Sequence, residues 1–186
     1  MNLELQNKVV LVSGGSKGIG RAISECLAQE GAIPFVVSRN LDSLKEMQQS
    51  FNKKKWPLGT FKAELTQPDA CTAAVEEVVK QFGRLEGLVN NAGVNDTVGL
   101  EKGNYEAFVA SLHRNVVHYY LLAQQALPYL KKSKGAIVNI GSKVATTGQG
   151  NTSGYAAANG GRNALTREWA LELLPYSIRV NAVIVA

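Results

Sequence analysis

Ser142 and Tyr155 are the residues of this sequence whose types and spacing best indicate chemistry, namely proton transfer at a carbonyl or alcohol oxygen. Ser142 follows an apolar run that predicts a strand, and Tyr155 opens a segment with helical periodicity. A serine hydroxyl can hydrogen-bond to a substrate oxygen, and a tyrosine can act there as general acid or base. A lone serine and tyrosine more often have only structural roles, so other motifs must support this interpretation.

Two asparagines accompany this pair. Asn159 lies four residues after Tyr155, so the two share one face of the predicted helix. Its amide can donate hydrogen bonds but carries no charge. Asn115 lies inside a long apolar helix, where an asparagine competes with its own backbone hydrogen bonds. A surface position is the alternative for Asn115, but both asparagines are candidate site residues.

The segment 9–20, VVLVSGGSKGIG, predicts a phosphate site between a strand and a helix. Glycines let the chain bend tightly and approach a ligand closely. The N-terminus of the following helix presents free N–H groups and a partial positive charge, which favour a pyrophosphate. A purely structural glycine turn is the alternative. The candidate cofactor residues of this turn are Gly14, Ser16, Lys17, Gly18, Ile19 and Gly20.

The end of the second strand, predicted at 33–38, indicates which dinucleotide binds. A carboxylate at this position would bind the ribose 2′-hydroxyl of NAD. The sequence has Ser38 followed by Arg39, a neutral group and a cation that suit a 2′-phosphate. Lys17 can add a second positive charge to the same pocket. We therefore expect NADP as the cofactor, with NAD as the second choice.

Alternating strands and helices predict a parallel α/β sheet, because the first unit reads as β-α-β. Glu64 lies near the end of a third strand, and a fourth strand leads into Asn91, Ala92 and Gly93, where small residues permit close approach of a ribose and nicotinamide. Thr66 is expected to cap the next helix. Beyond the first strand at 8–12, the predicted strands are 33–38, 58–65, 87–90, 136–140 and 178–185, and the predicted helices after the first are 42–51, 66–82, 105–130 and 155–174.

Three features together resemble the short-chain dehydrogenase/reductase family: the glycine spacing of 14–20, the sequence NNAG at 90–93, and Ser142 with Tyr155. The resemblance implies a Rossmann-type doubly wound sheet of order 3-2-1-4-5-6, forming a single dinucleotide-binding domain over 1–186. It also implies an NAD(P)-dependent oxidoreductase that forms homodimers or homotetramers through the helices beginning at 105 and 155. Ser142 would polarise the substrate oxygen, Tyr155 would move the proton, and Asn115 would hold a water of the proton relay.

The sequence departs from the family pattern in three places. Asn159 stands where the family has a lysine, which lowers the pKa of the tyrosine and binds the nicotinamide ribose. The chain also stops after the sixth strand, whereas the family continues with a substrate-capping segment and a seventh strand. We expect weakened proton transfer, and the alternative is a cofactor-binding protein with little or no turnover. Glu64 stands where the family usually has an aspartate beside the adenine. The stretch TGQGNTSGY and the ending Val185-Ala186 look like a sugar dehydrogenase branch.

Composition argues against other classes of function. The net charge is +5, but its densest cluster, Lys53–Lys55, is short and predicts a solvated loop, so no nucleic-acid partner is expected. No apolar run is long enough for a membrane span, and the N-terminus lacks a signal-peptide layout, so we expect a cytoplasmic protein. His113 and His118 lack a ligand pattern for a metal. Cys26 and Cys71 fall on predicted apolar faces and are expected to be core thiols.

Overall fold

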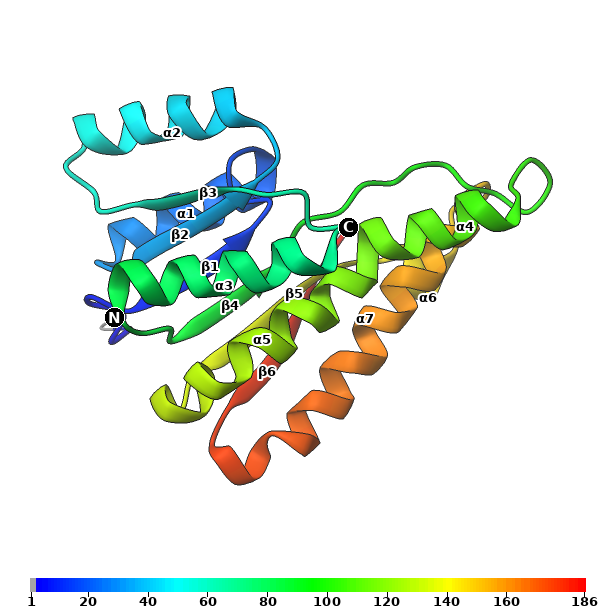
Figure 1. Ribbon diagram of the computed structural model, residues 1–186. Helices are drawn as coiled ribbons and strands as arrows, with labels where there is room; N and C mark the ends of the chain where they lie inside the picture. The colour runs from blue at the N-terminus through cyan, green and yellow to red at the C-terminus, as the bar shows by residue number, and fades with distance from the viewer. Residues whose placement is uncertain (1–2) are drawn as a thin grey trace.

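Six parallel strands form one sheet in the order β3-β2-β1-β4-β5-β6 (Figure 1). The computed structural model describes residues 3–186. The strands are β1 (Val9–Ser13), β2 (Ile33–Ser38), β3 (Gly59–Lys62), β4 (Gly87–Asn90), β5 (Ala136–Ser142) and β6 (Arg179–Val185). The predicted doubly wound topology is therefore confirmed. The strand order reverses between β1 and β4, and ligands bind at such a switch point in open α/β sheets.

Helices cover both faces of this sheet. The helices of the first half are α1 (Gly18–Gln29), α2 (Leu41–Lys53) and α3 (Pro68–Phe82). A longer helical segment follows, made of α4 (Tyr105–Leu112), a π turn η1 (His113–Val117) and α5 (His118–Ser133). The last helices are α6 (Val144–Thr147), α7 (Ser153–Glu172) and the 3-10 turn η2 (Leu174–Tyr176). Figure 1 shows α3, α5 and α7 side by side along one face.

The strands divide their apolar side chains between the two faces, as alternation along a strand requires. Leu11 and Phe35 point into the larger core, which α3, α5 and α7 cover. Val12 packs in a smaller cluster with partly buried side chains of α1, and Val36 packs against α2. The strands are therefore packed against helices on both faces of the sheet, and this packing sets the positions of their ends. The residues that follow β1, β4 and β5 are positioned by these ends.

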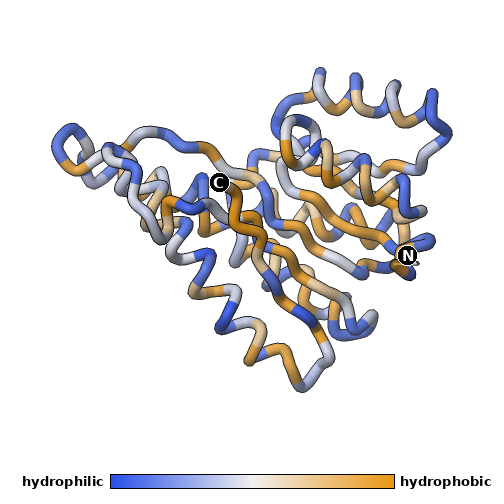
Figure 2. The backbone as a smooth tube through the Cα atoms, turned by 180° about the vertical axis from the view of Figure 1, so that it is seen from behind, coloured by the Kyte–Doolittle hydropathy of each residue, from blue (hydrophilic) through white to orange (hydrophobic). Residues whose placement is uncertain are grey.

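The outer strand β6 keeps an apolar and accessible surface. Figure 2 shows this hydrophobic run in the view from behind, with the C-terminus near the middle of the molecule. Val183 is 52% exposed and Ile184 is 46% exposed. β6 pairs with β5 on one side, from Ala136 with Arg179 to Ser142 with Val185. None of the helices in the described part of the chain has both the length and the apolar character of a membrane span.

The structure corrects three local predictions. The helix predicted at 105–130 is interrupted by the π turn, which contains Asn115. Thr66 does not cap α3, because Gln67 occupies the N-cap position and the Thr66 hydroxyl donates to Glu64 instead. Cys26 is exposed rather than buried, since the buried residues of α1 are Gly20, Ser24 and Ala28, beside the predicted face rather than on it.

Candidate active site

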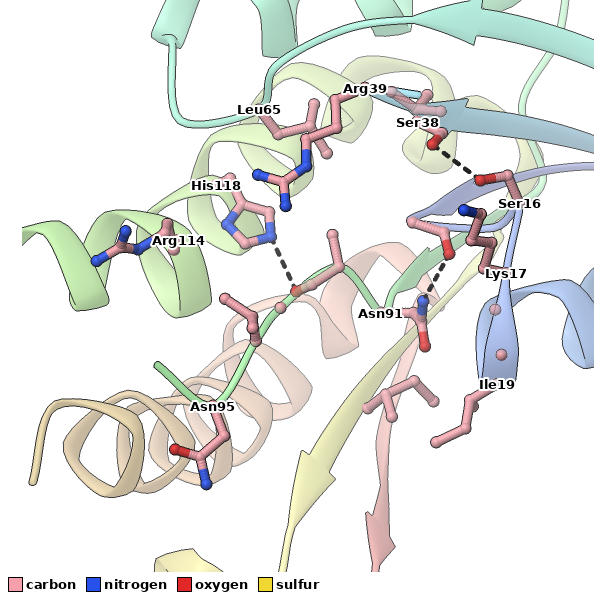
Figure 3. A pocket seen from close by; sticks show the side chains of 18 of the residues that line it. Ser16, Lys17, Ile19, Ser38, Arg39, Leu65, Asn91, Asn95, Arg114 and His118 are labelled. Atoms are coloured by element: carbon pink, nitrogen blue, oxygen red, sulfur yellow. Dashed lines mark hydrogen bonds between the residues drawn. The ribbon is translucent and has the colours of Figure 1, made fainter. Parts of the chain in front are cut away.

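A cavity of about 810 Å³ opens at the carboxyl ends of β1, β2, β4 and β5. Figure 3 shows Ser16, Lys17 and Ser38 at one end of this cavity and Arg114 and Asn95 at the other. Two residues predicted for chemistry, Ser142 and Tyr155, line it. All of the predicted cofactor residues line it as well, namely Gly14, Ser16, Lys17, Gly18, Ile19, Gly20, Ser38, Arg39, Glu64, Asn91, Ala92 and Gly93.

The glycine turn is built by contact with the loop after β4. A Cβ on Gly20 would lie 2.3 Å from the main-chain oxygen of Gly14 and 2.5 Å from Nδ2 of Asn91, so a side chain has no room. Asn91 Nδ2 donates to the main-chain oxygens of Ser13 and Gly14, at 2.9 and 3.2 Å. α1 begins without a side-chain cap and without an acidic residue in its first turn. Its first N–H groups therefore remain available to an anion.

Ser13 joins the two loops that form the floor of the cavity. Its hydroxyl oxygen accepts from the main-chain N–H groups of Asn91 and Ala92, at 2.9 and 3.1 Å. The hydroxyl donates in turn to the main-chain oxygen of Val89 at 3.4 Å. Since Ser13 is fully buried, these bonds are shielded from water. The end of β1 thus holds the loop after β4 in position.

Hydroxyl groups and cations gather where β2 ends. Ser16 Oγ lies 2.8 Å from Ser38 Oγ and 3.1 Å from Ser43 Oγ, which brings three residues from different segments together. Lys17 and Arg39 are both exposed beside this cluster. Arg39 Nη1 lies 3.6 Å from Glu64 Oε2, so Glu64 restrains this cation. The corner combines hydrogen-bond donors with positive charge, which is the chemistry that binds a phosphate.

Ser142 and Tyr155 reach the cavity from different elements. Ser142 is the last residue of β5, and its Oγ accepts weakly from the N–H of Val144 at 3.4 Å. Tyr155 lies in the first turn of α7 and is half-buried. Both hydroxyl groups can therefore meet one substrate oxygen in the cavity, with the serine donating and the tyrosine exchanging a proton.

Asn115 lies beneath the cavity and does not line it. Its Oδ1 accepts from the N–H of Val94 at 2.8 Å, and its Nδ2 donates to the main-chain oxygen of Ser111 at 3.0 Å. The main-chain oxygen of Asn115 accepts from Arg162 Nε at 2.6 Å. Asn115 thus uses its polar groups to fix the loop after β4 and the guanidinium of Arg162.

Asn159 is fully buried and also lies outside the residues that line the cavity. Its Nδ2 donates to the main-chain oxygen of Tyr155 at 2.9 Å, while its Oδ1 accepts from Arg162 Nη1 at 3.2 Å. These two bonds engage the polar atoms of Asn159 within α7.

His118 holds the loop after β4 from the side of α5. Its Nε2 lies 3.1 Å from the main-chain oxygen of Ala92, and its Nδ1 lies 3.2 Å from that of His113. Burial lowers the pKa of His118 to about 4, and the nearby charge of Arg162 acts in the same direction. The imidazole is therefore neutral near pH 7. Among residues 3–186, no cluster of His, Cys, Asp or Glu could hold a metal ion.

The sequence analysis missed Ser13, His118 and Arg162 as residues of this site. Arg162 had a detectable signal, because it follows Tyr155 and Asn159 at helical spacing and must share their face. Ser13 lies inside the glycine motif but before its first glycine. His118 gave no signal, since its role depends on the carbonyl of Ala92, which is distant in sequence.

Comparison with known sequences gives the same family from the whole chain. The sequence model described as short chain dehydrogenase matches residues 8–186. The chain is 35% identical over 185 residues to the 3-oxoacyl-[acyl-carrier-protein] reductase FabG of Thermotoga maritima, covering 97% of this chain and 74% of that protein. It is also 35% identical over 179 residues to the L-fucose dehydrogenase of Rattus norvegicus, covering 95% of this chain and 64% of the relative.

Solved structures agree with this result. A structure titled Cj0485 dehydrogenase superimposes with a TM-score of 0.91 at 36% identity, covering 99% of this chain and 70% of the other. An NAD+-bound xylitol dehydrogenase gives a TM-score of 0.91 at 30% identity, covering 96% of this chain and 70% of the other. The similarity therefore extends over the complete described fold.

Proposed function

Because the chain belongs to the short-chain dehydrogenase family, we propose that it transfers hydride between a nicotinamide cofactor and a carbonyl or secondary alcohol. One observation carries the proposal: a single cavity is lined by the glycine turn, by the loop after β4, and by Ser142 and Tyr155. The family consists of NAD(P)-dependent oxidoreductases. The two relatives described above are a reductase and a dehydrogenase.

The residues of the cavity fit a dinucleotide. The uncapped N-terminus of α1 suits its pyrophosphate, and Gly20 lets the glycine turn pack closely against Asn91 at this end of the cavity. The corner formed by Ser16, Ser38 and Arg39 suits a 2′-phosphate, which favours NADP over NAD. When bound, the nicotinamide supplies or accepts the hydride.

The remaining steps belong to protein side chains. Ser142 donates a hydrogen bond to the substrate oxygen, which stabilises the charge that develops there. Tyr155 gives its proton to that oxygen during reduction and takes one during oxidation. Asn115 and Asn159 support this pair from below, through Arg162 and the main chain of Tyr155. Sugars and polyols are the first substrates to test, since two relatives are named for L-fucose and xylitol.

A second candidate is a cofactor-binding protein with little or no turnover. Asn159 favours it, because an amide at this position brings no charge to Tyr155. The two candidates share their cofactor site and differ in turnover. We include a cytoplasmic location in the proposal, and the free thiols of Cys26 and Cys71 fit such a reducing compartment. Neither candidate includes a nucleic-acid or membrane partner.

The test combines cofactor titration with turnover on a panel of ketones, sugars and polyols. Binding of NADPH together with turnover that Tyr155→Phe abolishes would support the enzyme. Tyr176→Phe is the matched control, because Tyr176 is exposed on η2 and away from the cavity. Tight binding without turnover across the panel would favour the second candidate, and failure to bind either cofactor would reject both.

A further inference from the structure

Arg162 is a buried cation inside the site. Only 3% of its surface is exposed, although arginine is almost never fully buried unless it is paired. It lies on α7 seven residues after Tyr155, so both side chains point from one face of the helix. Arg162 also lines the cavity, together with Tyr155.

This cation has no carboxylate partner in the part of the chain that the structure describes. The ion pairs of residues 3–186 do not include Arg162. Removing an unpaired charge from water is costly, and burial accordingly lowers the pKa of the guanidinium. Arginine nevertheless remains protonated in proteins. A permanent positive charge therefore lies beneath the active site without a counter-ion.

Neutral oxygens hold the guanidinium in one orientation. Nε donates to the main-chain oxygen of Asn115 at 2.6 Å, and Nη1 donates to the main-chain oxygen of Ile140 at 3.0 Å and to Asn159 Oδ1 at 3.2 Å. Nη2 donates to Asn115 Oδ1 at 3.4 Å. Its carbon Cζ lies 4.3 Å from the ring centroid of Tyr119. These bonds use four of the five N–H groups, so little of the guanidinium is left to anchor a substrate.

The geometry of α7 brings Arg162 to the side of Tyr155. Both residues line the cavity from one face of the helix, and Asn159 lies between them, donating to the main-chain oxygen of Tyr155 and accepting from Arg162 Nη1. Burial lowers the pKa of the guanidinium, and the nearby Tyr119 and Tyr155 act in the opposite direction. A cation held beside a phenol in turn stabilises the phenolate. The contribution of Asn159 is to accept a hydrogen bond from Arg162 Nη1, which orients the guanidinium.

We propose that Arg162 supplies, beside Tyr155, the fixed positive charge that short-chain dehydrogenases take from a lysine at the position of Asn159. The inference rests on the proposed function. During reduction Tyr155 transfers its proton to the substrate oxygen, and the negative charge left on the phenolate is balanced by Arg162. During oxidation the proton returns to the phenolate. Arg162 keeps its own protons throughout, so it is a positioning and charge-balancing residue.

The first test moves the charge between the two positions. Arg162→Leu removes it, and the double variant Arg162→Leu with Asn159→Lys restores it at the family position. We expect Arg162→Leu to lose about a hundredfold in turnover near pH 7 and to regain part of it at higher pH. The double variant should recover most of the loss. Arg167→Leu, which removes an exposed arginine from the same helix, is the matched control and should leave turnover unchanged.

A purely structural role would give a different pattern, with loss at every pH and no recovery from a lysine at position 159. Unchanged turnover and pH profile in a folded Arg162→Leu chain would overturn the proposal. If Arg162→Leu does not fold, the double variant and Arg162→Lys decide. Turnover near that of the unmodified chain in both would support the proposal, and loss in both folded variants would overturn it.

A second measurement does not need turnover. The ultraviolet absorbance of tyrosinate is recorded against pH, and subtraction of the matching Tyr155→Phe chain isolates the signal of Tyr155. This signal should develop at lower pH in the unmodified chain than in the Arg162→Leu chain. The same midpoint in both would overturn the proposal. If the midpoints differ but no carbonyl is reduced, the proposed function fails, and only the effect of the Arg162 charge on Tyr155 is supported.

Discussion

His118 Nε2 lies 3.1 Å from the main-chain oxygen of Ala92, which ties the first turn of α5 to the loop that follows β4. Burial lowers the pKa of this imidazole from 6.5 to about 4. Between these values the unfolded chain binds a proton at His118 and the folded chain does not, so stability falls as the pH falls through this window. The loss amounts to up to about 3 kcal/mol in the free energy of unfolding.

Urea unfolding of the unmodified chain and of His118→Asn, at pH 7 and at pH values down to about 4, checks this expectation. Asparagine can still donate to the carbonyl of Ala92 but does not titrate. The unmodified chain should lose more stability than the variant as the pH falls. Parallel pH profiles would show that His118 contributes nothing to the acid sensitivity of the fold.

Arg39→Ala should lower the affinity for NADPH by about tenfold and leave that for NADH nearly unchanged. The reason is that Arg39 borders the hydroxyl corner of Ser16 and Ser38, where a 2′-phosphate fits. Arg84→Ala is the control for net charge, because Arg84 pairs with Glu86 before β4 and away from the cavity. Fluorescence titration measures both constants. If the unmodified chain binds NADH as tightly as NADPH, the assignment of the corner is wrong.

Gly93→Ala should destabilise the fold by about 1–3 kcal/mol and reduce turnover. A Cβ at Gly93 would lie 2.7 Å from Arg162 Nη2 and 2.9 Å from Asn115 Oδ1, so it would displace the guanidinium from its present position. Gly160→Ala is the control, since a Cβ there meets nothing within 4 Å and improves helix propensity by about 1 kcal/mol. Denaturant unfolding compares the two variants. A Gly93→Ala chain as stable as the unmodified chain would mean that the loop yields without cost.

Asn159→Lys as a single change should raise turnover far less than the hundredfold that restoring a missing charge would give. Arg162 already holds a positive charge, and its Nη1 lies 3.2 Å from the Asn159 side chain, so a lysine would add a second cation beside it. Turnover and the dissociation constant of NADPH are measured for both chains. A gain of about a hundredfold would instead support the expectation from the sequence, namely that Tyr155 has no positive charge beside it.

The helices α4, α5 and α7 should pair between subunits in a homodimer or homotetramer. Tyr105 is 77% exposed at the start of α4, and Leu171 is 72% exposed near the end of α7, which leaves apolar surface on both segments. Leu171→Glu should weaken association, measured by light scattering at micromolar concentration. Leu41→Glu on α2 is the control and should leave the mass unchanged. A monomeric unmodified chain would reject this prediction.

The sequence predicted most of the sheet because its strands are short apolar runs with clear ends. The strands at 33–38 and 87–90 were predicted to the residue, since turn residues bound them. The strand order came from the resemblance to a family, because pairing between distant segments leaves no local pattern. The π turn could not be predicted, since every residue of 105–117 is compatible with an ordinary helix.

The cofactor half of the site could also be predicted, because glycines, Ser38 and Arg39 form local sequence motifs. The buried position of Arg162 beneath Tyr155 could not be predicted. An arginine on a helix normally predicts a surface position, and the burial of Arg162 depends on oxygens of Asn115 and Ile140, which come from other elements. The burial of Cys26 was predicted wrongly for a similar reason, because packing against the sheet decides which face of α1 is buried.

The π turn at His113–Val117 limits how the length of this chain can vary. It holds one more residue per hydrogen-bonded ring than an α-helix does. Deleting a single residue there would close the turn to the ordinary repeat and change the directions of the side chains within it. Asn115 could then no longer face both Val94 and Arg162. A helix that looks uniform in sequence therefore contains a position where an insertion or deletion costs the site its geometry, whereas the same change in an exposed loop would be absorbed.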